Sequence, residues 1–205
     1  MYKTVLREAS AQIVEKNSRF IASVKPVETR EEAEAFIEAV AKKNRTANHN
    51  VYAYVLRQDH FQKHSDDGEP GGTAGLPVLN VLLRQELTDA VIVVTRYFGG
   101  VLLGTGGLVR AYSAAAALGV EAAKPVVVRL FTKAKLRLGY ERYGAVSAAL
   151  AALGAVCEDT QFTDSVEISI RIAQEDFEPF CKKIADLTNG TVFPDKTGEE
   201  FLAQE

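Results

Sequence analysis

The chain has 205 residues, a net charge of −3 at pH 7 and a hydrophobic content of 47%. This length fits one large domain or two small ones, and the balance of apolar and charged residues excludes an intrinsically disordered chain. No apolar run approaches the roughly 18–20 residues that cross a bilayer, so we expect no membrane association. The first residues lack the apolar stretch of a secretory signal, and we therefore expect a cytoplasmic location.

Charge is distributed unevenly along the chain. Residues 1–130 carry a slight excess of Lys and Arg, whereas residues 131–205 carry a clear excess of Asp and Glu. A surface that binds nucleic acid would therefore have to be a local patch on the first part.

The first part of the chain predicts a mixture of strands and helices. Residues 3–15 and 19–27 alternate as two strands. Thr29 and Glu32 then form a capping box, which predicts that a helix begins here. The remaining expected elements are a strand over 49–57, a polar loop over 58–72, a helix over 73–87, a buried strand over 90–94 and an Ala-rich helix over about 106–123.

The residues after Pro125 predict a second domain. Asp164 and Ser165 form a hairpin turn between two alternating strands. The order βαββαβ is the ferredoxin-like split βαβ pattern, so the fold class is α+β and the domains are placed at residues 1–130 and 131–205. The expected elements are strands over 126–138, 155–163, 166–173 and 191–194, and helices over 141–153 and 175–188.

The first segment that could carry chemistry is His64–Gly75, in which Asp66, Asp67 and Glu69 lie within four residues. Carboxylates this close repel one another unless they are solvated, paired with Arg or bound to a cation. One interpretation is a rigid recognition loop or a Mg²⁺ site at these three residues, and we expect no other cofactor. The other interpretation is an exposed turn in which Asp caps a helix.

The second segment is Thr95–Tyr112, where a strand runs into glycines that open a helix. Backbone amides at such a turn bind anions, aided by the helix dipole. Arg96 and Arg110 offer phosphate contacts, and Tyr97 and Phe98 offer rings for stacking. The alternative is that the glycines only allow close packing of helix and strand. The expected nucleic-acid or anion-binding residues are Arg96, Tyr97, Phe98, Gly99, Gly100, Gly104, Gly106, Gly107 and Arg110.

The acidic loop and the strand before it are expected to face this glycine-rich site. Salt bridges or one Mg²⁺ would then order the loop. The residues expected on that side are His49, Asp66, Asp67, Glu69 and Thr73.

Three segments resemble the YigZ/IMPACT family, in sequence and in the spacing between them: HNVYAYVLR, SDDGEPGGTAG and VVTRYFGGVLLGTGGLVRAYSAAA. The resemblance extends over nearly the whole chain and implies two α+β domains. The first is similar to the βαβ-containing fold of a small-subunit ribosomal protein and of elongation factor G domain IV. The second is similar to elongation factor G domain V.

The resemblance also implies a function linked to translation. Both fold relatives work on RNA, and the eukaryotic family members are translational regulators that compete for the activator of a kinase acting on an initiation factor. Val51 and Gly71 stand where many members have Cys and Ser. Neither position can therefore supply an essential nucleophile, which favours binding over covalent catalysis.

We therefore predict a translation-associated regulatory protein that binds RNA or a ribosome-linked partner through its first domain, with binding favoured over catalysis. One alternative is a Mg²⁺-dependent enzyme that acts on a nucleotide or a phosphorylated small molecule. A third interpretation is a protein-binding module whose acidic second domain is the contact surface. The sequence does not predict an oligomeric state.

Overall fold

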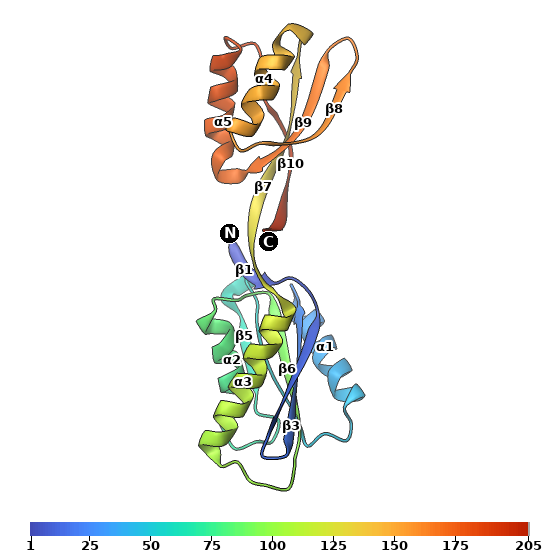
Figure 1. Cartoon of the computed structure of the whole chain (residues 1–205), viewed down its shortest axis with the longest axis vertical. Coiled ribbons are helices and arrows are strands. Elements are labelled where there is room, and N and C mark those ends of the chain that lie inside the picture. Colours follow the sequence, from blue (N-terminus) through green and yellow to red (C-terminus); the bar gives the residue numbers. More distant parts are fainter. Residues whose placement is uncertain (205) are drawn as a thin grey trace. The chain divides into compact units, whose positions relative to one another are not determined.

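The computed structural model describes residues 1–204. Its contacts divide the chain into two units, Tyr2–Val127 and Val128–Gln204. Each unit combines helices with a β-sheet, as Figure 1 shows, and buries apolar side chains of its own. No helix among the described residues is long and apolar enough to cross a membrane.

The elements of the first unit are β1 (Tyr2–Val5), β2 (Ala9–Glu15), β3 (Ser18–Pro26), α1 (Arg30–Lys43), β4 (His49–Val55), the 3₁₀ helix η1 (Gln58–His60), β5 (Gln62–Ser65), α2 (Gly75–Arg84), β6 (Ala90–Tyr97) and α3 (Thr105–Ala123). The central sheet has the order β2-β3-β6-β4-β5. Both β3 and β4 run antiparallel to β6, which lies between them. The sequence β3–α1–β4 is therefore a split βαβ unit.

The strands of this sheet place their side chains alternately in two cores. Ile92 and Val94 of β6 pack with residues of α2 and α3, whereas Val91 and Val93 pack with residues of α1. Successive strand residues point to opposite faces, so α1 covers one face and α2 and α3 cover the other (Figure 1). By the same alternation Arg96 faces the side of α2 and α3, which positions it for the site described below.

The predicted start of α1 is confirmed. The hydroxyl of Thr29 accepts the amide of Glu32 at 3.2 Å. The carboxylate of Glu32 accepts the amide of Glu28 at 2.7 Å, one residue earlier than in the standard capping box. The first bond satisfies one of the unpaired amides of the first turn, and the second fixes the chain just before the helix.

Two predictions for the first unit are wrong in detail. The strand expected over residues 3–15 is two strands, β1 and β2, which belong to different sheets, and between them the amide of Leu6 donates to the carbonyl of Lys124 at 2.9 Å. The loop expected over residues 58–72 contains η1 and β5. Strand β5 pairs with β4 at the edge of the sheet, where its polar side chains are solvated and give no apolar pattern.

The elements of the second unit are β7 (Pro125–Leu138), α4 (Tyr140–Ala152), β8 (Val156–Phe162), β9 (Val166–Ala173), α5 (Gln174–Leu187) and β10 (Asp195–Gln204). Here β9 pairs with both β7 and β8, and β10 pairs with β7, which gives the order β10-β7-β9-β8 of the ferredoxin-like fold. The last strand, expected over 191–194, begins at Asp195 instead. Val192 is buried in the core, so its apolar signal belongs to the connection before the strand.

Candidate functional site

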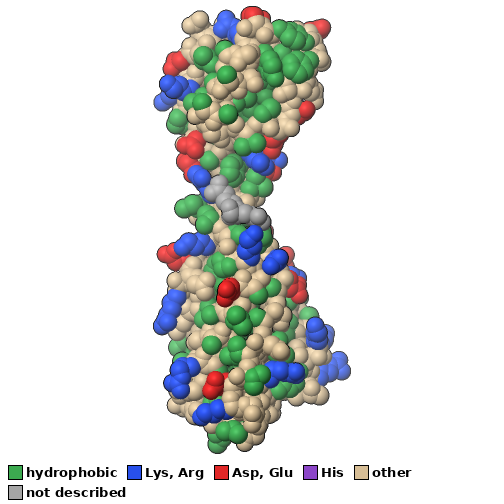
Figure 2. Space-filling view, in the orientation of Figure 1, with side chains coloured by type: hydrophobic (Ala, Val, Ile, Leu, Met, Phe, Trp, Pro, Cys, Tyr) green, Lys and Arg blue, Asp and Glu red, His purple; other side chains and the backbone are tan. Residues whose placement is uncertain are grey.

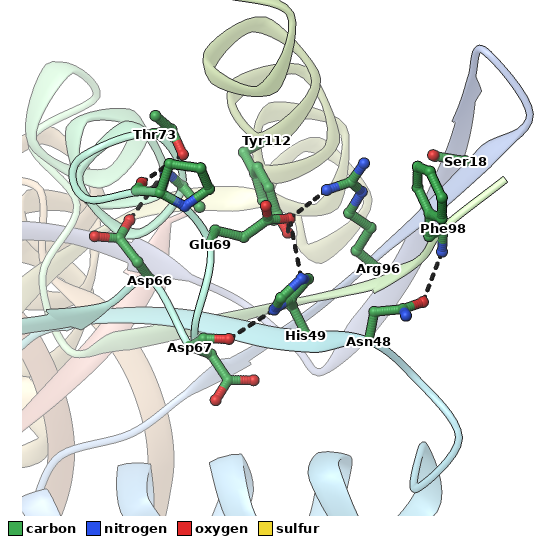
Figure 3. A network of polar contacts seen from close by, with 12 residues as sticks. Ser18, Asn48, His49, Asp66, Asp67, Glu69, Thr73, Arg96, Phe98 and Tyr112 are labelled. Carbon is green, nitrogen blue, oxygen red and sulfur yellow. Dashed lines mark hydrogen bonds and ion pairs between the residues drawn. The ribbon is translucent and has the colours of Figure 1, made fainter. Parts of the chain in front are cut away.

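A buried ion pair joins the two segments that the sequence singles out. Nη1 of Arg96 on β6 lies 2.6 Å from Oε1 of Glu69, and the two side chains are 7% and 3% exposed. The hydroxyl of Tyr112 on α3 donates to the same oxygen at 2.7 Å, as Figure 3 shows. Burial and the adjacent carboxylate raise the pKa of Tyr112 far above its ordinary value. Tyr112 therefore stays protonated and acts as a hydrogen-bond donor.

His49 lies beside this ion pair. Strand pairing sets His49 of β4 directly opposite Arg96 of β6. Its Nδ1 lies 2.7 Å from the carbonyl oxygen of Asp67 and, because a carbonyl only accepts, Nδ1 carries a proton. Its Nε2 lies 3.8 Å from Oε1 of Glu69, which is too far for a hydrogen bond.

Asp66 stabilises the start of α2. Its Oδ1 accepts the amides of Ala74 at 3.0 Å and Gly75 at 2.7 Å, and its Oδ2 accepts the amide of Gly72 at 2.9 Å. Burial raises the pKa of Asp66, but these three N–H groups together hold it below its ordinary value. The side chain therefore acts as a helix cap from the preceding loop, as one of the two interpretations of the acidic segment expects.

The three carboxylates of the acidic loop hold three different sets of partners. Oδ2 of Asp67 accepts the amide of Asn50 at 2.5 Å, while Asp66 and Glu69 bind the groups described above. The hydroxyl of Thr73 donates to the carbonyl of Pro70 at 2.6 Å and tightens the same turn. Within residues 1–204 there is no group of three or more His, Cys, Asp and Glu side chains that could hold a metal ion. The geometry therefore gives the Mg²⁺ alternative no support.

Glycines determine the path of the loop that follows β6. Gly100 and Gly104 adopt φ angles of 84° and 74°, a region that favours glycine. A Cβ atom at Gly99 would lie 2.1 Å from the backbone of Asn17, so only glycine allows the loop to contact the turn between β2 and β3. The loop then leads directly into α3.

A groove of about 480 Å³ opens at the N-terminus of α3. Gly104 supplies no side-chain cap, so the first-turn amides of Thr105–Gly107 have no partner within the helix. Phe98 and Leu102 at the edge of the groove are 43% and 81% exposed. We call this feature the α3 groove; it is lined by Asn48, His49, Glu69, Pro70, Arg96, Phe98, Leu102, Leu103, Gly104, Thr105 and Leu108.

Basic side chains lie near the α3 groove. Arg110 and Lys16 line a second groove of about 230 Å³, which shares Leu103 with the first. A Cβ atom at Gly106 would lie 3.6 Å from Nη1 of Arg110, so this guanidinium lies over the first turn of α3. Figure 2 shows Lys and Arg side chains near the end of the first unit at which α3 begins.

Two of the predicted binding residues are not free to bind a phosphate in the α3 groove. Arg96 is only 5% exposed, and Nη1 of its guanidinium is paired with Glu69. Tyr97 points to the opposite face of the sheet, where its ring lies 4.6 Å from the guanidinium of Arg19 and its hydroxyl donates to Asn44 at 3.0 Å. Phe98 and the first turn of α3 remain accessible.

The sequence did not single out several residues of the site. Tyr112 continues the apolar stripe of α3, which hides its polar role. Asn48 lies in a short connection, where its Oδ1 accepts the amide of Phe98 at 2.8 Å and so fixes the loop. The lining leucines belong to a glycine-rich stretch, and only their exposure in the fold distinguishes them from core residues.

A larger groove of about 820 Å³ lies on the opposite face of the sheet, between α1 and the strands β2 and β3. Lys25, Phe36 and Lys43 are among the residues that line it. None of the residues predicted for the site lies there, so it is not the site that the sequence indicates.

Fold and site together define a class: an α+β protein with a split-βαβ unit, whose glycine-rich loop adjoins a buried ion pair, followed by a ferredoxin-like unit. Residues 16–120 match the family model of the Impact N-terminal domain, and residues 136–191 match the model of a domain of unknown function, DUF1949. The chain belongs to the IMPACT family, in agreement with the resemblance seen in the sequence.

Relatives and solved structures are similar over most of the chain. IMPACT family member YvyE of Bacillus subtilis is 37% identical over 190 residues, which cover 92% of this chain and 88% of the relative. IMPACT family member YigZ of Escherichia coli is 31% identical over 197 residues, covering 94% and 97%. A crystal structure described as a hypothetical protein matches with a TM-score of 0.59 at 28% identity, covering 96% of this chain and 97% of that one. These matches support the two-unit α+β fold.

Proposed function

We propose that this protein is a translation-associated regulator whose first unit binds single-stranded RNA at the N-terminus of α3. The observation that carries the proposal is the uncapped, glycine-rich first turn of α3, which lies between the exposed ring of Phe98 and the basic side chains of Lys16 and Arg110. Family membership supports the link to translation, since the eukaryotic members that the sequence resembles regulate that process.

Phosphate groups would bind the first turn of α3. The amides of Thr105–Gly107 lack partners, and the helix dipole adds a partial positive charge at this end. Glycines at positions 106 and 107 leave the backbone open to close approach. Arg110 adds a guanidinium over the same turn, where it can bind a phosphate through two N–H groups.

A base would stack on Phe98, whose ring is 43% exposed. Stacking of this kind contributes about 1–3 kcal/mol per base and tolerates any sequence, since every base has a π face. In this proposal Arg96 does not meet phosphate. It holds Glu69 and so keeps the wall of the α3 groove in place.

The experiment is fluorescence anisotropy of labelled octauridylate RNA with the full chain at two salt concentrations. We expect log affinity to fall with log salt by roughly 0.7 per contacted phosphate, with about 2–4 contacts for so small a surface. Arg110→Ala should weaken binding of all sequences equally and remove about one contact from the slope. Phe98→Ala should weaken binding by about 1–3 kcal/mol with little change in slope.

The matched control is Arg84→Ala, because Arg84 is an exposed arginine on α2 that lines neither the α3 groove nor the smaller groove beside it. This variant should bind RNA like the wild type. If the folded wild type binds no RNA at low salt, the RNA proposal is wrong and a protein partner becomes the leading candidate.

A further inference from the structure

We infer that the α3 groove takes one unstacked base of a bound nucleotide, with the phosphate of that nucleotide on the first turn of α3. This inference rests on the proposed function and adds the class of ligand that the groove itself recognises. The groove holds about 480 Å³, within the range of about 300–1,000 Å³ that is typical of pockets for small molecules.

The walls of the α3 groove suit the two faces of a base. Phe98, Leu102, Leu103 and Leu108 line it with apolar side chains, and Phe98 and Leu102 are exposed before any ligand binds. An exposed apolar pocket with a few polar groups is the usual design of a ligand site. A flat heteroaromatic ring would bury this surface and stack against the phenyl ring.

Among the described residues that line the groove, one buried nitrogen has no hydrogen-bond partner, and two other side chains carry polar atoms that make no hydrogen bond. Nε of Arg96 is buried and makes no hydrogen bond. Asn48 uses its Oδ1 to accept the amide of Phe98, which leaves its two Nδ2 hydrogens free. His49 donates from Nδ1 to a carbonyl, which leaves Nε2 without a hydrogen bond. A buried polar atom is normally satisfied, so Nε of Arg96 indicates a polar partner, whereas Asn48 is exposed and its Nδ2 hydrogens are open to solvent or to a ligand.

The set of free groups matches the edge of a base. The donor groups of Arg96 and Asn48 can pair with the carbonyl and ring-nitrogen positions that bases present. The first turn of α3 borders the same groove through Gly104 and Thr105, while Gly107 lines the smaller groove beside it. One ligand with a ring and a phosphate therefore uses all of these features at once.

The test measures displacement of labelled octauridylate from the full chain by adenosine 5′-monophosphate and by ribose 5-phosphate. The nucleotide should compete at least about 10-fold better than the sugar phosphate, because only the nucleotide carries a base that stacks. Thr105→Phe places a ring in the groove and should abolish competition by the nucleotide. The matched control Val109→Phe adds the same ring one turn later on α3, outside the groove. The nucleotide should compete for this variant as it does for the wild type.

Phe98→Ala is the second variant, with an expected loss of nucleotide affinity of about 10-fold or more. Phe98 and Thr105 are both exposed, so the two variants should fold, and an unfolding curve of each variant is the check. If the wild type binds RNA but the nucleotide competes no better than ribose 5-phosphate, or if Thr105→Phe leaves nucleotide competition unchanged, the base pocket is wrong while the proposed function stands. If the wild type binds no RNA at all, the proposed function fails and this inference fails with it.

Discussion

At the scale of single residues, the carboxylate of Glu69 connects the acidic loop, β6 and α3. It accepts hydrogen bonds from Arg96 and Tyr112, and its side chain is 3% exposed. Glu69→Ala would leave the buried guanidinium without a partner, which costs about 3–5 kcal/mol. We therefore expect the free energy of unfolding of the first unit, measured with urea, to fall by that amount.

A surface ion pair provides the control for this measurement. Glu86 pairs with Lys3, but its side chain is 75% exposed. Glu86→Ala should leave the unfolding curve unchanged within error, since exposed pairs contribute little. Equal losses in Glu69→Ala and Glu86→Ala would contradict the account of Glu69 as the buried centre of the site.

The carboxylate of Asp66 makes stability depend on pH. Three backbone amides hold its folded-state pKa below the ordinary value of 3.8. The unfolded state therefore takes up a proton first, and the stabilisation is present above that value and lost as the pH falls through the folded pKa. Between about pH 6 and about pH 3, the free energy of unfolding measured with urea should fall more steeply for the wild type than for Asp66→Asn. Parallel curves for the two proteins would show that the cap contributes no acid sensitivity.

At the scale of elements, α3 packs on β3 through a glycine. A Cβ atom at Gly119 would lie 2.7 Å from Cβ of Ala22 and 3.0 Å from Cγ2 of Val24. Replacing a mid-helix glycine by alanine gains about 0.5–1 kcal/mol, but forcing an atom into a packed core costs about 1–3 kcal/mol. Gly119→Ala should therefore lower the melting temperature of the first unit.

Gly144 in α4 is the matched position for that test. No heavy atom lies within 4 Å of a Cβ built there. Gly144→Ala should therefore stabilise α4 by the about 0.5–1 kcal/mol that alanine gains over glycine in a helix, and raise the melting temperature of the second unit. Stabilisation by both substitutions would show that α3 and β3 are less closely packed than described.

Most elements could be predicted from local sequence, because their signals are local. Thr29 and Glu32 fix the start of α1. Pro125 marks the end of the Ala-rich helical stretch, and α3 ends at Ala123. Strand β5 could not be predicted, since its polar residues become a strand only by pairing with β4. The same holds for the break between β1 and β2, which depends on a bond from Leu6 to a residue far along the chain.

At the scale of the whole molecule, the contacts divide the chain after Val127, whereas the sequence places the boundary after residue 130. The segments of the candidate site could be predicted from their composition, but their partners could not. His49 meets Arg96 only through the register of β4 and β6, and Asp66 reaches Gly75 only because the loop folds back on α2. Long-range pairing of this kind leaves no spacing signal in the sequence.

The most direct test of RNA binding by the first unit is photo-crosslinking of the full chain to single-stranded RNA that contains thiouridine, with mass-spectrometric identification of the linked peptides. The account predicts crosslinks in the segment from Arg96 to Tyr112 and in the turn at Lys16, with few in the unit Val128–Gln204. It also predicts that Phe98→Ala removes most of the crosslinks in the first segment. Crosslinks confined to Val128–Gln204, or none at low salt with the folded protein, would contradict it.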